Sequence, residues 1–337
     1  MRVRFSNAFG DRPLTIAGAA IAPSLGAHRV DTAAQRTLTF GGNASVTIPV
    51  GRDTTSDVVP YALAPLSNVA ISTRFASVPS ALTGHPGSRT TSYLQSGDAL
   101  LAPNLPAAVA TVHWYVVAGI DVPAINESAA LIVLGNSITD GRGSGTDRQN
   151  RWPDELARRL HAEPSTRHVA VLNAGIGGNC VLRDCLGPSA LARLDRDVLQ
   201  APGARWLIVL EGVNDIGQAK DAEQADSIAR GLIAAYRQIV ERAHARGLVV
   251  YGATILPFGG SNYDAPHREA ARTTVNRWIR ESGTFDAVID LDAAMRDPAR
   301  PSHLAGVADG GDHLHPNEAG YRMMAAAIDL ALFRRSR

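Results

Sequence analysis

A serine hydroxyl becomes a nucleophile only when an adjacent base removes its proton, and imidazole is suited to this because it titrates near neutral pH. The chain offers such a pair in Ser137, which follows the apolar run 131–134, and His315, which lies in GDHLHPN at 311–317. Asp312 stands three residues before His315 and could accept the other ring N–H, which would fix the tautomer. These residue types are the ones that acyl transfer requires.

Acyl transfer also needs hydrogen-bond donors around the oxyanion of its tetrahedral intermediate. Two further turns supply candidates, NAGIGGN at 173–179 and EGVND at 211–215. We expect the donors to be the backbone N–H groups of Ser137 and Gly178 and the side-chain amide of Asn214. Glycine at 178 would let the backbone approach a bound group without a Cβ in the way.

The elements that must position these residues form an alternating pattern from residue 130 onward. Compact apolar runs lie at 131–134, 169–173, 206–212, 248–255 and 287–292. Amphipathic patterns separate them and close the chain, predicting helices over 151–163, 189–200, 222–247, 268–282 and 317–333. Continuous apolar runs are typical of strands buried on both faces, so the pattern predicts a parallel sheet in a three-layer α/β domain. Ligands of such sheets bind beyond the carboxyl ends of the strands, which is where all the candidate residues fall.

The first 125 residues follow a different pattern. Short segments rich in Val, Ile, Thr and Tyr are broken by Gly, Pro and Asn at short intervals, which is typical of an antiparallel sandwich. We therefore predict two domains, an N-terminal β-sandwich over 1–125 and an α/β catalytic domain over 126–337.

Four sequence blocks, GNSITDG, NAGIGGN, GVND and DHLHPN, occur in this order at the predicted strand ends. Together they resemble the blocks of the SGNH (GDSL-type) serine hydrolase family over roughly residues 129 to 330. The resemblance implies a flavodoxin-like sheet of five parallel strands and no metal or organic cofactor. It implies the roles of nucleophile for Ser137, oxyanion donors for Gly178 and Asn214, and Asp–His pair for Asp312 and His315. Some members, including certain carbohydrate acetylesterases, also carry an N-terminal β-sandwich, which would be jelly-roll-like.

One residue departs from the family pattern. The family usually has Gly-Asp-Ser where this chain has Gly135-Asn136-Ser137. Asparagine has the shape of aspartate but no charge, and it adds an NH2 donor. We hypothesise that Asn136 holds the turn less firmly than aspartate would, so that the site is retained but less active. A much slower Asn136→Asp variant would count against this hypothesis.

Each candidate has a competing interpretation. Ser137 alone could be a helix N-cap, His315 a surface histidine, and Asp309 an alternative to Asp312 because it is near. A metal site could be suggested by His303, Asp309, His313 and His315, but their spacing fits no familiar ligand pattern, and a solvated loop accounts for the first three. Three arginines at 142, 148 and 151 could line the cleft or could be ordinary exposed residues.

Cys180 and Cys185 lie directly after the candidate oxyanion glycine. The sequence leaves open whether they form a disulfide, which would suit an oxidising compartment, or two free thiols.

Charge and hydropathy exclude some partners. The net charge is +1 and the basic residues are dispersed, which argues against a nucleic-acid surface. No apolar run approaches the roughly 18 residues of a membrane span. The segment MRVRFSNAFG has no apolar core of a signal peptide, so the chain is expected to be secreted or periplasmic only if a leader was removed, and otherwise cytoplasmic. The oligomeric state is not predicted.

We therefore expect a serine carboxylic-ester hydrolase acting on short-chain esters, preferably acetyl, in small molecules or carbohydrates. The preference rests on the resemblance and on the low aromatic content of 5%. The alternatives are a lipase, phospholipase or thioesterase of the same family, or a glycan-binding protein with an impaired hydrolase domain.

Overall fold

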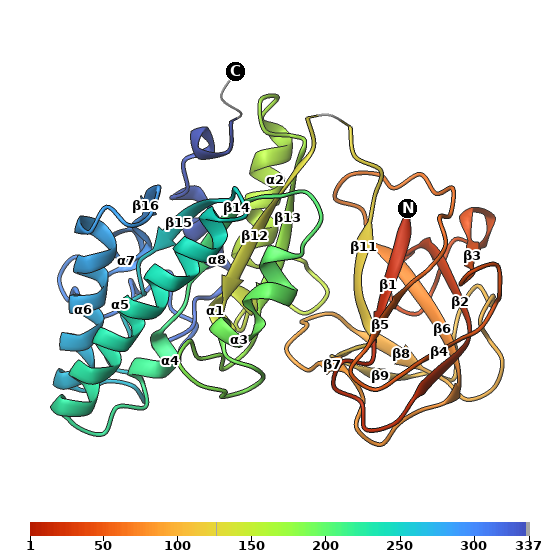
Figure 1. Ribbon diagram of the computed structural model, residues 1–337, viewed down its shortest axis with the longest axis horizontal. Coiled ribbons are helices and arrows are strands. Elements are labelled where there is room, and N and C mark those ends of the chain that lie inside the picture. Colours follow the sequence, from red (N-terminus) through yellow and green to blue (C-terminus); the bar gives the residue numbers. More distant parts are fainter. Residues whose placement is uncertain (126, 335–337) are drawn as a thin grey trace. The chain divides into compact units, whose positions relative to one another are not determined.

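The computed structural model describes residues 1–125 and 127–334. The chain divides into two compact units, Met1–Ile125 and Asn126–Arg337 (Figure 1). No helix among the described residues is long and apolar enough to cross a membrane.

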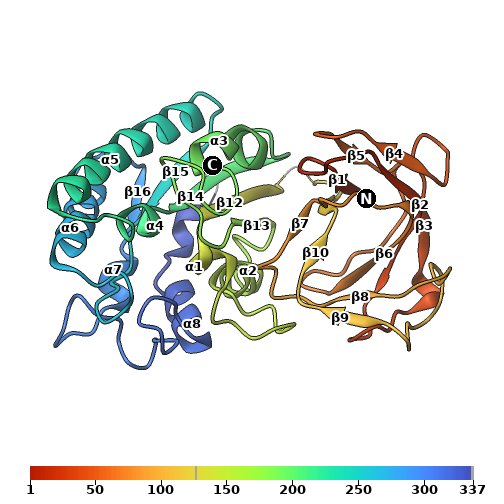
Figure 2. The same ribbon diagram turned by 90° about the horizontal axis from the view of Figure 1, so that it is seen from below.

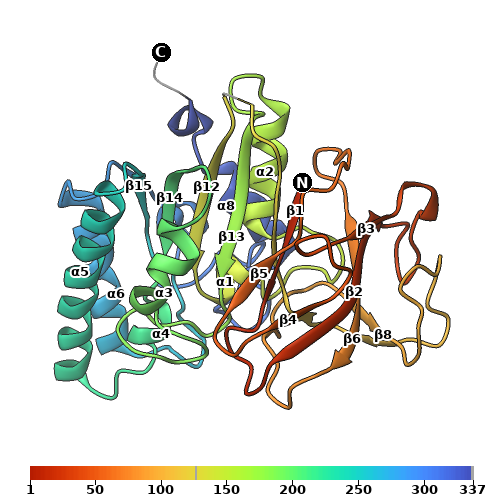
Figure 3. The same cartoon turned by 45° about the vertical axis from the view of Figure 1, so that its right-hand side comes forward.

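The N-terminal unit is all-β and its strand pairs are antiparallel. Its strands are β1 (Arg2–Ser6), β2 (Leu14–Pro23), β3 (Arg36–Leu38), β4 (Val46–Ile48), β5 (Asp53–Thr55), β6 (Val69–Ser77), β7 (Gly84–His85), β8 (Ser92–Leu94), β9 (Val109–Thr111), β10 (Trp114–Tyr115) and β11 (Val117–Asp121). β1 lies between β11 and β5, while β2 pairs with β3, β4 and β6 (Figure 3). A 3-10 helix, Thr32–Ala34, precedes β3.

The two larger sheets of this unit share one hydrophobic core. Phe5 of β1 and Ile16 and Ile21 of β2 are fully buried in it. Alternate residues of a strand point to opposite faces, so each sheet turns one apolar face toward this core. The turn-rich sequence predicts these antiparallel sheets, although it does not single out the short strands β5 and β7.

The C-terminal unit is built on five parallel strands, as the apolar runs predict. They are β12 (Ala129–Gly135), β13 (Val169–Gly175), β14 (Ala204–Leu210), β15 (Val249–Ala253) and β16 (Ala287–Ile289). Their order in the sheet is β13-β12-β14-β15-β16. β12 is therefore next to the centre, and every one of its residues is buried.

Helices cover both faces of this sheet. They are α1 (Ser137–Asp140), α2 (Trp152–Ala162), α3 (Ala190–Leu194), α4 (Val213–Ile216), α5 (Ala222–His244), α6 (Pro266–Glu281), α7 (Leu291–Met295) and α8 (Glu318–Ala326). α3 and α5 lie on one side of the sheet, and α2, α7 and α8 lie on the other (Figure 2). The predicted helix over 189–200 divides, because α3 is followed by a short π-helix, Asp195–Leu199.

The prediction of one continuous helix over 317–333 is wrong. α8 ends at Ala326, and a separate 3-10 helix, Leu330–Phe333, follows. Arg159 of α2 donates hydrogen bonds to the carbonyl groups of Ala325 and Ile328. Because these carbonyls are satisfied from outside the helix, the chain can leave the helical path there without burying unpaired groups.

Candidate active site

Ser137 is the first residue of α1, at the point where β12 turns into that helix. Asn136 caps the helix, since its Oδ1 accepts a hydrogen bond from the N–H of Ile138 at 3.1 Å. The turn is tight at Gly135, where a Cβ would lie 2.1 Å from Oγ1 of Thr139. The sharp turn leaves the Ser137 side chain at the carboxyl end of the sheet, 8% exposed.

A serine, a histidine and an aspartate lie in one hydrogen-bonded line. Ser137 Oγ is 2.8 Å from His315 Nε2, and His315 Nδ1 is 2.7 Å from Asp312 Oδ2. Asp312 Oδ1 also accepts the backbone N–H of His315 at 2.8 Å and that of Leu314 at 3.1 Å. The aspartate therefore fixes both the ring and the backbone of the histidine. With Nδ1 protonated toward Asp312, Nε2 is the basic nitrogen that faces the serine.

The pKa of Asp312 lies below its ordinary value. Partial burial raises this pKa, but the hydrogen bonds from the backbone and the side chain of His315 outweigh that effect. The carboxylate therefore stays ionised while it orients the imidazole.

Asp309 has another partner. Its Oδ2 contacts Nδ1 of His313, and its Oδ1 accepts the backbone N–H groups of Gly311 and His313. Of the two aspartates, only Asp312 bonds to His315 in the part of the chain that the structure describes. No group of three residues able to hold a metal occurs among residues 1–125 and 127–334.

The candidate oxyanion donors lie on three neighbouring turns. Gly178 has the positive φ of +70° that favours glycine, and its N–H donates to no backbone carbonyl among the described residues. Ser137 begins α1, and the first N–H groups of a helix have no partner within that helix. The amide of Asn214, on α4, donates one hydrogen to the carbonyl of Asn179 at 2.8 Å, which leaves its second hydrogen for a bound group.

Asn214 is held from its other side by a residue outside the four sequence blocks. The hydroxyl of Tyr263 donates to Oδ1 of Asn214 at 3.0 Å. These two contacts fix the orientation of the amide, because the oxygen must face the hydroxyl and the nitrogen must face the Asn179 carbonyl. Tyr263 lies in the loop between β15 and α6, and no signal in the sequence marks it.

Side-chain contacts join the turn that carries Ser137 to the turn that carries Gly178. Asp140 Oδ2 accepts the N–H of Gly177 at 3.0 Å. Asn173 donates from Nδ2 to the carbonyl of Thr139 at 2.8 Å. Asp140 and Asn173 stand inside the sequence blocks, so their presence is visible in the sequence although their contacts are not.

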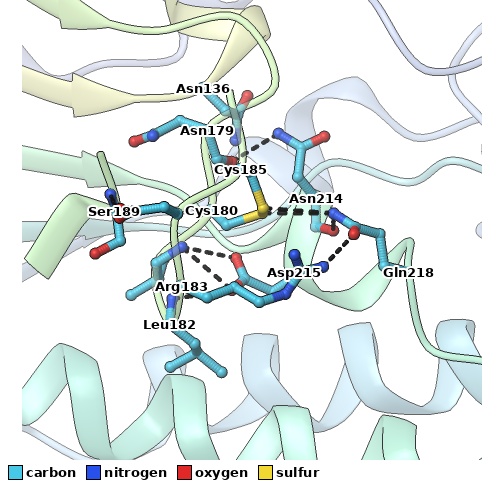
Figure 4. Close-up of a disulfide and its surroundings, with 12 residues drawn as sticks. Asn136, Asn179, Cys180, Leu182, Arg183, Cys185, Ser189, Asn214, Asp215 and Gln218 are labelled. Atoms are coloured by element: carbon cyan, nitrogen blue, oxygen red, sulfur yellow. Dashed lines mark hydrogen bonds between the residues drawn. A yellow bond between two sulfur atoms is a disulfide. The ribbon is translucent and has the colours of Figure 1, made fainter. Parts of the chain in front are cut away.

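Cys180 and Cys185 form a disulfide. The loop that they close begins two residues after Gly178 and is fastened to α4 through Asp215, which accepts the N–H groups of Val181 and Leu182 at 2.9 and 3.0 Å (Figure 4). Burial raises the pKa of Asp215, and these backbone donors oppose the rise. The disulfide loop is thus attached to the same short helix that carries Asn214.

The three arginines after the nucleophile turn differ in their partners. Arg148 pairs with Glu318, and Arg151 pairs with Asp154. Arg142 lies nearest the candidate triad, with Nε 3.9 Å from Oδ2 of Asp312.

The family model of the GDSL-like lipase/acylhydrolase family matches residues 133–323. This match covers more than half of the chain, and the chain belongs to that family of hydrolases. The acetylxylan esterase Axe2 of Geobacillus stearothermophilus is a structural neighbour with 23% identity and a TM-score of 0.45, covering 63% of this chain and all of Axe2. The lipase/acylhydrolase of Enterococcus faecalis is another, with 20% identity and a TM-score of 0.43, covering 59% of this chain and 92% of its own. No curated protein matches the sequence.

Proposed function

We propose that this protein is a serine carboxylic-ester hydrolase that works through an acyl-enzyme on short-chain esters. The observation that carries the proposal is the line from Ser137 Oγ to His315 Nε2, at 2.8 Å, and from His315 Nδ1 to Asp312, at 2.7 Å. Nucleophile, base and orienting acid are each within hydrogen-bond reach of the next, which is the geometry that serine catalysis needs.

Acylation begins when Ser137 Oγ attacks the carbonyl carbon of the ester while its proton moves to His315 Nε2. The carbonyl π electrons move to the oxygen, and the N–H groups of Ser137 and Gly178 and the amide of Asn214 stabilise the resulting oxyanion. Asp312 remains ionised and stabilises the imidazolium. When the intermediate collapses, the carbon–oxygen bond to the alcohol breaks, and the leaving oxygen takes the proton from Nε2.

Deacylation repeats these steps with water. His315 removes a proton from the water as its oxygen attacks the acyl carbon. The second oxyanion uses the same donors, and its collapse expels Ser137 Oγ, which recovers its proton from His315. The products are a carboxylic acid and a free enzyme.

The short acyl group, acetyl in preference, rests on the resemblance of the sequence blocks and on the low aromatic content of 5%. A series of p-nitrophenyl esters from C2 to C12 separates this proposal from a lipase or a long-chain thioesterase. The highest kcat/KM is expected at C2 to C4, and a maximum at C8 or longer would overturn the short-chain part of the proposal.

Hydrolysis of p-nitrophenyl acetate by the wild type and by Ser137→Ala tests the reaction itself. The matched control is Ser165→Ala, which removes an exposed serine hydroxyl of the same unit. We expect a loss of about 10⁴-fold or more in kcat for Ser137→Ala and no change for the control. Equal turnover in all three proteins, or turnover in none, would refute the proposal.

A further inference from the structure

A buried ion pair lies beneath the nucleophile turn. The side chains of Arg193, on α3, and Glu211, directly after β14, are both 0% exposed, and Arg193 Nη2 is 3.5 Å from Glu211 Oε1. Removing two charges from water is costly, and such a pair is tolerated only where further hydrogen bonds satisfy both groups. Their contacts therefore indicate what the pair holds in place.

Arg193 reaches the ends of two strands and the oxyanion turn. It donates to the carbonyl of Gly135 at the end of β12 at 3.1 Å, and to the carbonyl of Ala174 near the end of β13 at 2.6 Å. It also donates to Oδ1 of Asn179 at 2.9 Å, and Asn179 is the residue whose carbonyl accepts the Asn214 amide. One guanidinium thus forms hydrogen bonds with both the segment that leads to Ser137 and the segment that contains Gly178. Its remaining contact is with Asp197 at 3.2 Å.

Glu211 connects this arginine to Asn136. Its Oε2 accepts the Asn136 side-chain N–H at 3.4 Å and the backbone N–H of Gly212 at 3.4 Å. Asn136 Nδ2 also faces the carbonyl of Leu210 at 3.4 Å. Asn136 therefore uses its oxygen to cap α1 and its nitrogen to face two acceptors.

An aspartate at position 136 could make only half of these contacts. Its carboxylate could cap α1, but it has no hydrogen to donate, so it would place an acceptor oxygen against two further acceptors, Glu211 Oε2 and the carbonyl of Leu210. Arg193 already faces two carboxyl groups, Glu211 at 3.5 Å and Asp197 at 3.2 Å, so a further buried carboxylate would add a third around one guanidinium. Burial already raises the pKa of Glu211, while the charge of Arg193 opposes the rise. The site therefore has little capacity for a further anion.

We propose that Glu211 and Arg193 are positioning residues for Ser137 and its oxyanion donors, and that Asn136 is the neutral donor which this buried pair requires. Asparagine at 136 is then a matched partner of Glu211, and this proposal replaces the hypothesis, drawn from the family pattern, that Asn136 makes the site less active. The catalytic part of this inference rests on the proposed function.

Four variants of the full chain test the pairing: Asn136→Asp, Glu211→Gln, the double variant that combines them, and the control Asn104→Asp. The control makes the same charge change at an exposed asparagine of the N-terminal unit. The readouts are the labelling rate of Ser137 by a fluorophosphonate probe, kcat and KM for p-nitrophenyl acetate, and Tm. The probe reads the reactivity of the serine independently of the ester substrate.

We expect Asn136→Asp to lower kcat and the labelling rate by about 10- to 100-fold, which lies within the coupling of about 0.5–3 kcal/mol between contacting groups, with a smaller change in KM. The double variant should recover most of both, because the amide introduced at position 211 can donate to the carboxylate introduced at position 136. The number of carboxyl groups around Arg193 is then the same as in the wild type. Asn104→Asp should behave as the wild type. If Asn136→Asp does not fold and the double variant does, the same pairing is supported.

Two results would overturn the inference: an Asn136→Asp variant as active as the wild type or more so, or a double variant that is no better than Asn136→Asp in folding and in labelling. Failure of the proposed function looks different, because the wild type would then neither be labelled nor hydrolyse the ester. In that case the Tm values of the same four variants still decide whether residues 136 and 211 are coupled. Only the proposal that the pair positions Ser137 for catalysis would then be refuted.

Discussion

Tyr263→Phe removes one hydroxyl and leaves the ring in place. That hydroxyl donates to Oδ1 of Asn214 at 3.0 Å and so fixes the side-chain amide that we propose as an oxyanion donor. One hydrogen bond of this kind contributes on the order of 1 kcal/mol net, which is about fivefold in rate. Complete loss of an oxyanion donor costs about 10²- to 10³-fold in kcat. We therefore expect a loss of about 5- to 10-fold for Tyr263→Phe and of about 100-fold or more for Asn214→Ala.

The assay is steady-state hydrolysis of p-nitrophenyl acetate, with kcat and KM measured separately. The loss should fall on kcat, since the donor is needed more in the transition state than in the bound substrate. Tyr251→Phe is a matched control, because the Tyr251 hydroxyl bonds to the carbonyl of Leu332 and not to any of the proposed donors. That variant should lower Tm and leave kcat unchanged.

The decisive comparison is the double variant Tyr263→Phe with Asn214→Ala. If Tyr263 acts through Asn214, removing the hydroxyl in the alanine background should cost nothing further in kcat. A further 5- to 10-fold loss in that background, or an unchanged kcat for Tyr263→Phe alone, would refute the reasoning.

Three more predictions concern the aspartate of the triad and the disulfide. Asp312→Asn should lower kcat by about 10³- to 10⁴-fold in the ester assay, and full activity in that variant would contradict its role beside His315. The pKa of Asp312 is lowered in the folded chain, so its ionised form stabilises the fold above about pH 4, and this contribution is lost as the pH falls through the lowered pKa. The Tm difference between the wild type and Asp312→Asn should therefore shrink between pH 5 and pH 3. A Tm difference that stays constant over this range would contradict the stabilising role of the ionised carboxylate. Reduction of the Cys180–Cys185 disulfide should lower the free energy of unfolding by about 2 kcal/mol for so short a loop; the Cys180→Ser/Cys185→Ser variant should not respond to reductant, and an unchanged wild-type Tm with both thiols titratable would contradict the contribution.

The sequence predicts the parts of this molecule that depend on local patterns. Each strand of the C-terminal unit lies in an apolar run, although the edge strand β13 is buried only at its two ends and not on both faces. Parallel strands have their carboxyl ends at one edge of the sheet. The residues after β12, β13 and β14 must therefore lie near one another. The pattern does not decide between Asp309 and Asp312, because both stand on the same loop and only the course of its backbone determines which one meets His315.

Other features could not be predicted because they depend on contacts between distant segments. In the sequence, Arg193 is one of several basic residues on an amphipathic helix. Its burial depends on hydrogen bonds to carbonyl groups at the ends of two strands, and the sequence pattern does not show that these carbonyls lie near it. Tyr263 lies in a loop without periodicity. The end of α8 is set by an arginine that is more than 160 residues earlier in the chain, so helix propensity alone extends the helix too far.

The hydrogen bond between Ser137 and His315 joins residues 178 positions apart in the sequence. Ser137 is on the first turn of the C-terminal unit, and His315 comes after its last strand. While the chain is being synthesised from its N-terminus, the serine is present long before its base. Until the final segment folds against the sheet, His315 is not in place to accept a proton from Ser137. If Ser137 is the nucleophile that we propose, its reactivity toward a phosphonate therefore reports the completion of folding.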